Sequence, residues 1–187
     1  GNPEAIKAFE EEIAKLKGAS HPSLVPVIAG GCEGDWFYLA MELIPGETVR
    51  DALKESGGKL PIQTAVEIFK EMAEAAGEIH QQGIFHGHID SRAVLYKGDK
   101  VRLAGYYPRA VDKIQSQATS VGRFTVDPSY IAPEQLGQAG ELDKRADIYA
   151  LAVLMFEMVT GQRPFSAGNP LQTAMLRLTQ NPPSPSK

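Results

Sequence analysis

Apolar side chains recur every three or four positions along two stretches of the chain, which is the pattern of an amphipathic helix. Residues 3–17 carry Ile6, Phe9, Ile13 and Leu16 at this spacing, and Gly18 follows as a helix stop. Residues 64–82 show the same period and end at Gly83. The apolar stripe predicted for this longer helix consists of Val66, Phe69, Met72, Ala73, Ala76, Ile79 and His80.

Other stretches show strand patterns or are apolar without a clear period. Residues 24–29 and 36–43 are rich in β-branched and aromatic side chains and predict two strands around a glycine-rich turn at 30–35. Residues 94–96 and 101–104 predict a hairpin. Short helices are expected at 48–55 and 170–180. Residues 144–160 are apolar almost all round, which predicts a fully buried central helix that ends at Gly161.

Composition narrows the possible partners and location. The chain has 187 residues and is 43% hydrophobic, enough for a packed core, and its formal net charge of -4 gives no basic surface for nucleic acid. The longest apolar run, 148–156, is too short to insert in a membrane. Cys32 is the one cysteine and cannot form an internal disulfide, which fits a reducing compartment. We therefore expect a cytoplasmic protein, or the cytoplasmic domain of a longer one.

Residues 83–95 carry the most informative motif, Gly-Ile-Phe-His-Gly-His-Ile-Asp-Ser-Arg-Ala-Val-Leu. The segment resembles the catalytic loop of protein kinases, H-R-D-L-x-x-x-N, in which the Asp accepts the substrate proton and the Asn holds magnesium. His86 keeps the first position, whereas His88 replaces the Asp and Ala93 replaces the Asn. Gly105 stands where the family's D-F-G motif has its magnesium-binding Asp. The resemblance therefore implies that these three positions have lost their catalytic groups.

Four further segments match the serine/threonine kinase family, with bacterial-type features, in the same order. They are 9–13 with 21–25, 130–136, 145–151 and 161–165, so the resemblance runs from the family's αC helix to its αG helix. It implies an α+β, protein kinase-like fold, with a partial small lobe of one helix and two antiparallel strands and a mainly helical large lobe. We expect boundaries at 1–44 for the small-lobe remainder, 45–180 for the large lobe and 181–187 for a Pro/Ser-rich tail.

The resemblance also implies structural roles for residues that remain. Asp147 would cap the catalytic-loop backbone, and Glu12 stands where the family's αC glutamate pairs with a small-lobe lysine. Glu134 belongs to the A-P-E motif, but the arginine that usually pairs with it has no counterpart here. The family's hydrophobic spine would be filled by Leu16, Val27, His86 and Tyr106. A vestigial nucleotide pocket would be lined by Met41, Glu42, Ile44 and Leu95.

Two questions stay open at this stage. A second register reads His88-Ile89-Asp90 as the H-R-D motif and makes Asp90 a catalytic base, although it leaves Gly105 without a metal-binding group; otherwise Asp90 is expected to be a solvated loop acid. The segment 108–129 resembles an activation segment, where Ser116, Thr119, Ser120 and Thr125 are possible phosphorylation sites. Gly87 cannot clamp a phosphate there, and Asp127 replaces the family's substrate-turn Thr.

We expect from these losses a pseudokinase, a non-enzyme that acts as a protein-binding or allosteric module. Its partner would be an active kinase or another domain of the same protein. No cofactor and no magnesium are expected, while ATP binding remains open. The alternative is a nucleotide-binding protein with weak or unconventional serine/threonine phosphotransferase activity, whose glycine-rich loop and lysine come from upstream sequence. Glu12 supports the alternative, because an αC glutamate makes most sense opposite a lysine.

Overall fold

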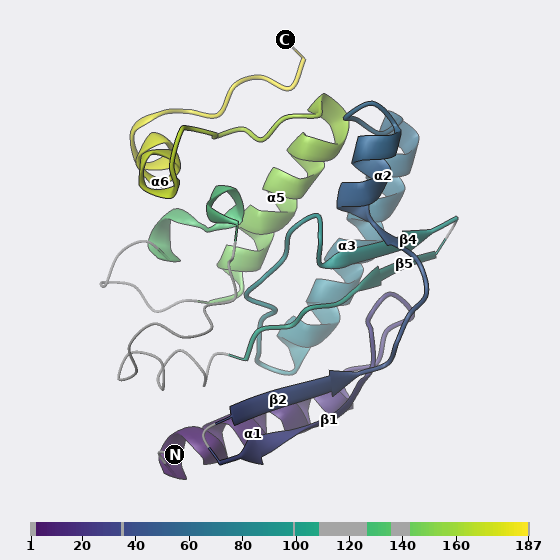
Figure 1. Ribbon diagram of the computed structural model, residues 1–187, viewed down its shortest axis with the longest axis vertical. Helices are drawn as coiled ribbons and strands as arrows, with labels where there is room; N and C mark the ends of the chain where they lie inside the picture. Colours follow the sequence, from purple (N-terminus) through teal and green to yellow (C-terminus); the bar gives the residue numbers. More distant parts are fainter. Residues whose placement is uncertain (1–2, 35, 99, 109–126, 136–142, 187) are drawn as a thin grey trace.

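The computed structural model describes residues 3–186, apart from 35, 99, 109–126 and 136–142. Two groups of elements lie one above the other in Figure 1, with the N-terminal group at the bottom. The two ends of the chain lie at opposite ends of the molecule. The helices are α1 (Pro3–Gly18), α2 (Val49–Glu55), α3 (Ile62–Gln81), α5 (Arg145–Thr160) and α6 (Pro170–Thr179). The strands are β1 (Val27–Glu33), β2 (Trp36–Met41), β3 (Glu47–Thr48), β4 (Val94–Lys97) and β5 (Lys100–Leu103).

The N-terminal group consists of α1 packed on an antiparallel pair, β1 and β2. Side chains along β2 alternate between half-buried and exposed, as expected for a sheet that is covered on one face. Phe37, on the covered face, meets Phe9 of α1 edge to face with ring centroids 5.0 Å apart. The aromatic contact and the apolar stripe of α1 hold this small unit together.

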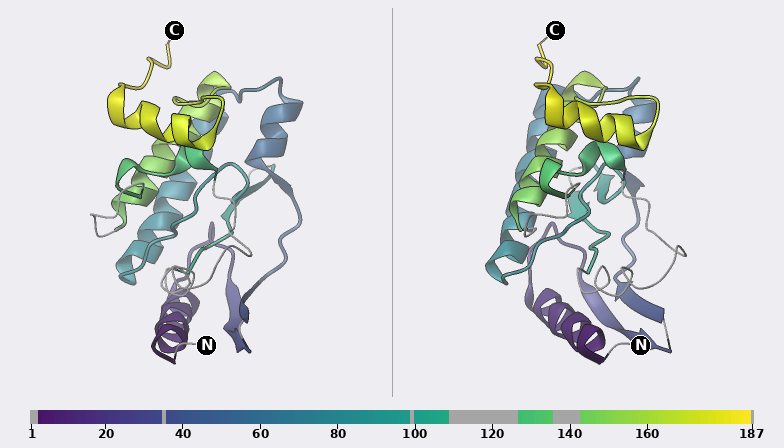
Figure 2. Two further views of the ribbon diagram at one scale, coloured as in Figure 1. Left: turned by 60° about the vertical axis from the view of Figure 1, so that its left-hand side comes forward. Right: turned by 90° about the vertical axis from the view of Figure 1, so that its left-hand side faces the viewer.

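The C-terminal group is built on α3 and α5, which pack together beside a small antiparallel sheet of order β3-β4-β5. Figure 2 shows α6 crossing the far end of this group, away from α1. Thr48 caps α2 through a reciprocal hydrogen-bonded box with Asp51. Buried residues from α2, α3, α5 and the sheet form one continuous core, in which Met72, Leu154 and Met158 are fully buried.

The two groups are joined by backbone hydrogen bonds as well as by the chain. Leu103 of β5 donates from its amide to the Ser23 carbonyl, 2.7 Å away, and accepts from the Val25 amide at 2.9 Å. The Ser23 hydroxyl also donates to the Glu71 carboxylate of α3. A second core cluster contains Phe9 of α1 together with Ile79 of α3, so apolar packing also crosses the boundary.

The first strand differs from the prediction. It runs from Val27 to Glu33, through the glycines that were expected to form a turn. A Cβ atom at Gly30 would lie only 3.0 Å from the Ile13 side chain, and one at Gly31 would lie 3.0 Å from the Tyr38 hydroxyl. These glycines therefore let α1 and the neighbouring strand approach closely, which is a packing role that turn statistics do not detect.

Two helix faces also differ from the prediction. The buried face of α3 contains Ala65, Ile68, Met72, Ala75, Ala76 and Ile79, whereas Val66 is 49% exposed. Three of the six buried residues are alanines, and α3 packs against α5 and the sheet. Ile148 is 56% exposed, so α5 is not buried all round. Among the helices described, none is long and apolar enough to cross a lipid bilayer.

Candidate functional site

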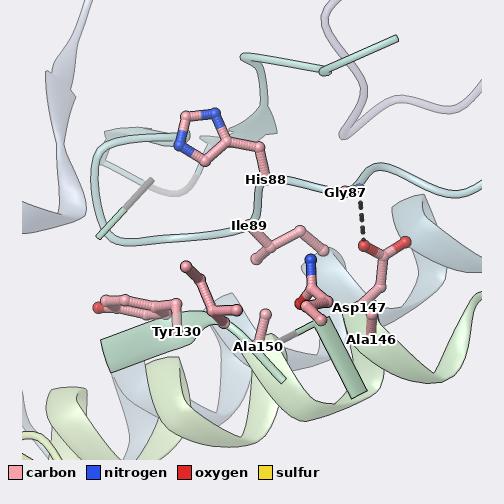
Figure 3. Close-up of a pocket in the computed structure, with 9 residues that line it drawn as sticks. Gly87, His88, Ile89, Tyr130, Ala146, Asp147 and Ala150 are labelled. Atoms are coloured by element: carbon pink, nitrogen blue, oxygen red, sulfur yellow. Dashed lines mark hydrogen bonds between the residues drawn. The ribbon is translucent and has the colours of Figure 1, made fainter. Parts of the chain in front are cut away.

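One carboxylate, from α5, anchors the backbone of the loop between α3 and β4. Asp147, on α5, is 1% exposed and accepts hydrogen bonds from the amides of His86 at 2.7 Å and Gly87 at 2.9 Å. The second of these bonds is drawn in Figure 3. The His80 ring lies 2.8 Å from the same carboxylate through Nε2. Asp147 therefore connects α5, α3 and the loop backbone.

His86 lies inside the fold and not in an open site. It is 1% exposed, its Nε2 lies 2.9 Å from the Ala104 carbonyl, and its ring meets Tyr106 edge to face. Burial lowers the pKa of His86 to about 4, against the opposing effect of the nearby Asp147 charge. The imidazole is therefore neutral at pH 7, and it connects the loop to the segment after β5.

His88 occupies a different environment from His86. Figure 3 shows its ring on the side of the loop that faces away from α5, whereas Ile89 points toward Ala150. Its Nε2 has no hydrogen-bond partner in the part of the chain that the structure describes, and lies 3.7 Å from a carboxylate oxygen of Asp90. Burial lowers the pKa of His88, and Asp90 opposes the shift. A neutral imidazole with an unused ring nitrogen can accept a proton.

Asp90 is buried, so the expectation of a solvated loop acid is wrong. It is 1% exposed and accepts from the amides of Arg92 at 2.7 Å and Ala93 at 3.1 Å. The Arg92 guanidinium donates to it at 2.9 Å. Burial alone would raise the pKa of Asp90, but the hydrogen bonds from Arg92 outweigh it and the pKa is lowered. These bonds give Asp90 a structural role in the turn at 90–93. Asp147 caps the amides of His86 and Gly87, and this favours the register in which His88 takes the position of the catalytic Asp.

The two positions that hold magnesium in the kinase family lie side by side here. Ala93 is 6% exposed, and a Cβ atom built at Gly105 would be 3.7 Å from the Ala93 Cβ. A methyl group and a hydrogen supply no oxygen ligand, and magnesium requires oxygen ligands. Among the residues described, no cluster of three or more His, Cys, Asp or Glu could hold a metal ion. The residues at these two positions do not fit magnesium.

A narrow cavity lies between the two groups of elements, beside these positions. Its lining includes the four residues expected in the hydrophobic spine, Leu16, Val27, His86 and Tyr106, together with Met41. Glu42 is exposed, and Ile44 and Leu95 are half-buried outside this lining. The structure therefore brings the spine residues together with one of the four residues assigned to a nucleotide pocket.

Glu12 meets a residue that the sequence did not suggest. The Tyr106 hydroxyl donates to its Oε1 at 2.6 Å, across 94 positions of sequence. Tyr106 itself is 8% exposed. The sequence assigned Tyr106 to apolar packing and Glu12 to a lysine, so the hydrogen bond between them could be found only from coordinates.

Sequence reasoning also missed Arg177 on α6. It is 7% exposed and donates to the carbonyls of Ile131 and Pro128, next to the A-P-E segment. Glu134 of that segment is exposed. Arg163, also missed, pairs with Asp127 at 2.8 Å and with Glu157 at 3.3 Å. The one available signal was a charged residue, Arg177, within an otherwise uncharged helical stretch. Ser116, Thr119, Ser120 and Thr125 lie outside the described residues.

Comparison with known proteins identifies the family. The model of the protein kinase domain matches residues 2–184. The chain belongs to the protein kinase domain family. The expected α+β, kinase-like fold with a partial small lobe is thereby confirmed, as is the likeness to bacterial-type members. The division at 1–44, 45–180 and 181–187 stays a prediction.

Several curated relatives of this kinase domain are bacterial proteins. The serine/threonine-protein kinase PknL of Mycobacterium tuberculosis is 30% identical over 98% of the chain and 45% of the relative. A protein of Clostridium perfringens named "Probable serine/threonine-protein kinase CPE1738" is 28% identical over 96% of the chain and 26% of the relative. PknB of Mycobacterium leprae is 26% identical over the whole chain and 30% of the relative. The chain thus spans less than half the length of these relatives.

These relatives overturn one prediction. The loss of the catalytic groups led us to expect a non-enzyme, but the relatives that match nearly the whole chain are named serine/threonine-protein kinases. They indicate an enzyme, and the expectation of a non-enzyme is wrong. Its error was to equate the absence of the usual side chains with the absence of the activity.

Proposed function

We propose that this kinase domain binds a nucleotide and transfers phosphate to serine or threonine weakly, through an altered catalytic loop. The glycine-rich loop and the lysine of the nucleotide site would come from sequence upstream of residue 3. The proposal follows the names of the relatives, which are serine/threonine-protein kinases. The observation that carries it is the geometry of His88, which directly follows the two amides held by Asp147 and has a buried Nε2 without a hydrogen-bond partner among the described contacts.

His88 would take the proton of the substrate hydroxyl as the hydroxyl oxygen bonds to the γ-phosphorus of ATP and the bond between the β and γ phosphates breaks, with ADP as the leaving group. Asp147 holds the two preceding amides, so the loop backbone keeps a defined shape at this point. Asp90, 3.7 Å away, would stabilise the imidazolium that results, because an opposite charge at this distance favours the protonated ring. A positioned general base contributes about 10²–10⁴-fold to rate.

Neutralisation of the phosphate charge is the weak point of this site, and it is the reason for proposing slow transfer. Ala93 and Gly105 offer no metal ligands, and Asp90 stands where the family has a cationic lysine. Because phosphoryl transfer depends mainly on positioning and charge stabilisation, the missing ligands lower the expected rate more than the altered base does.

Transfer of radiolabelled phosphate from ATP by the full-length protein tests the proposal. Wild type is expected to label a serine/threonine substrate or itself, and His88→Ala to reduce the rate about 100-fold or more. Asp90→Asn is the matched comparison, since the second register requires Asp90 and not His88 as the base. Absence of any transfer by wild type, or full activity in His88→Ala, would contradict the proposal.

Nucleotide binding is measured separately by thermal unfolding. ATP that binds the folded state raises the unfolding free energy by RT ln(1 + [L]/Kd), about 2.7 kcal/mol at a hundredfold excess over Kd. We expect the full-length protein to show an increase in melting temperature at millimolar ATP. An unchanged melting temperature would argue against a nucleotide site altogether.

We also propose, as a second role, that the domain contacts a protein partner, either an active kinase or another domain of the same protein. It is supported by the uncovered face of the β1–β2 pair, where Ile28, Trp36 and Tyr38 are 60%, 76% and 50% exposed. Contiguous exposed apolar side chains favour association. The chain produced alone is expected to self-associate, or to bind an added active kinase or another domain of the same protein, in size-exclusion chromatography with light scattering. A stable monomer that binds neither partner would contradict this role.

A further inference from the structure

The buried face of α1 contains one charged residue among apolar ones. Phe9, Ile13 and Leu16 are 1%, 4% and 6% exposed, and they follow the three-and-four spacing of one helix face. Glu12 lies on the same face and is half-buried, whereas the neighbouring Glu10 and Glu11 are exposed. A carboxylate turned toward an apolar core is costly unless a hydrogen bond or a charge compensates it. The position of Glu12 therefore requires a partner across the core.

Tyr106 is fixed where it can supply that hydrogen bond. Its ring packs in the cluster formed by Phe9, Ile13 and Leu16 of α1 with Ile79 of α3. His86 meets the ring edge to face, with centroids 5.9 Å apart. The hydroxyl then reaches Glu12 Oε1 at 2.6 Å, a short distance typical of a hydrogen bond to a charged acceptor.

We propose that Tyr106 and Glu12 form a latch that fixes α1 against the large lobe. In the kinase family the glutamate at this position pairs with a small-lobe lysine, but here a hydroxyl from the segment after β5 already holds it. Tyr106 is in this sense a positioning residue: it acts on the site by holding α1. The inference does not depend on phosphoryl transfer, since it concerns how the two lobes are held.

The latch couples two parts of the site. Tyr106 follows directly on Gly105, one of the two positions vacated by the metal ligands, and lies three residues after β5. A ligand that displaces Tyr106 must break its bond to Glu12, and a lysine that pairs with the Glu12 carboxylate would compete with the hydroxyl for it. The position of α1 and the conformation of residues 104–108 therefore influence each other's free energy.

Hydrogen exchange of the full-length protein, followed by mass spectrometry on peptides from residues 5–18, tests the latch. Tyr106→Phe removes the hydroxyl and keeps the ring. We expect it to speed exchange in α1 about tenfold or more, since hydrogen bonds to charged groups are among the stronger ones. Glu12→Ala should have a similar effect. Glu12→Gln keeps an oxygen acceptor without the charge, so its exchange should lie between that of wild type and that of Glu12→Ala.

Two control variants separate the latch from general effects. Tyr38→Phe removes an exposed hydroxyl from the same lobe, and Glu10→Gln neutralises an exposed carboxylate on the same helix; both should leave exchange in α1 unchanged. Wild-type exchange in Tyr106→Phe would overturn the proposal. So would a Glu12→Gln variant as fast as Glu12→Ala, since a partner that requires the negative charge is a cation and not a hydroxyl. Equal acceleration in every peptide would show a global loss of stability and also overturn it.

Discussion

His86 is neutral in the folded protein because no water reaches its ring. Its pKa falls from an ordinary value of 6.5 to about 4, so between these values the unfolded chain binds more protons than the folded one. Stability is fully present above about pH 6.5 and is lost as the pH falls toward 4. At pH 5 this single group should lower the unfolding free energy by about 2 kcal/mol relative to pH 7.

Urea unfolding at pH 5 and pH 7 measures that loss. His86→Gln keeps a polar side chain that does not titrate, and it should reduce the difference between the two pH values by about 2 kcal/mol. His88, whose pKa is also lowered, contributes in the same direction and remains in both proteins, so it cancels. An unchanged pH dependence in His86→Gln would show that His86 is protonated at the same pH in both states.

Asp147 is the residue whose loss should damage the loop most. It accepts hydrogen bonds from two backbone amides and lies 2.8 Å from the His80 ring nitrogen. Asp147→Asn exchanges one acceptor for a donor beside an amide, which should lower the unfolding free energy by roughly 2 kcal/mol in urea titrations. Asp143→Asn, at a carboxylate near the surface that pairs with Arg145, is the control and should change the unfolding free energy far less.

Among the elements, α6 contacts the 128–131 segment, and the Arg177 side chain supplies hydrogen bonds at this contact. Arg177 is largely buried and donates to two carbonyls of the 128–131 segment. Arg177→Lys replaces a planar fork by one ammonium, which cannot reach both carbonyls in the same geometry. We expect a loss of about 1–3 kcal/mol in unfolding free energy and faster hydrogen exchange in residues 128–135. Arg145→Lys, at an exposed position, is the control and should leave both measurements unchanged.

Element positions were predictable where local signals agreed with tertiary packing. Gly18, Gly83 and Gly161 correctly marked helix ends, because backbone conformation at a cap is a local property. The face of α3 was not predictable, since Val66 and Ala65 are equally acceptable on an isolated helix and the choice depends on how closely α5 approaches. The same holds for Gly30 and Gly31, whose place in a strand depends on α1.

In the whole molecule, the sequence was sufficient to identify the vacated positions but not to determine their consequences. His88, Ala93 and Gly105 could be read from the motif, and the structure shows that Ala93 and Gly105 are neighbours. Two contacts join segments that are far apart in sequence: Glu12 with Tyr106, and Arg177 with residues 128–131. No local sequence pattern predicts such contacts. Activity could not be inferred from the absence of side chains, since the relatives are named as kinases.

Returning two residues to the family pattern should create magnesium-dependent ATP binding. Ala93→Asn with Gly105→Asp would place an amide and a carboxylate oxygen side by side. Gly105 has a φ of +75°, which Asp tolerates better than most residues, at a cost of about 1 kcal/mol. We expect magnesium to increase the ATP-induced rise in melting temperature of the full-length double variant. Ala93→Asn with Gly105→Asn matches it in size without the charge, and an equal magnesium response there would contradict the prediction.

Asp147 binds the catalytic loop only through main-chain amides, at His86 and Gly87. These two bonds therefore do not depend on which side chain stands at position 88. The contacts that anchor the loop are thus separate from its reactive side chains. Point mutations can therefore exchange those side chains while the fold persists. For a protein engineer, the same separation makes this loop a frame in which new active groups can be installed one at a time.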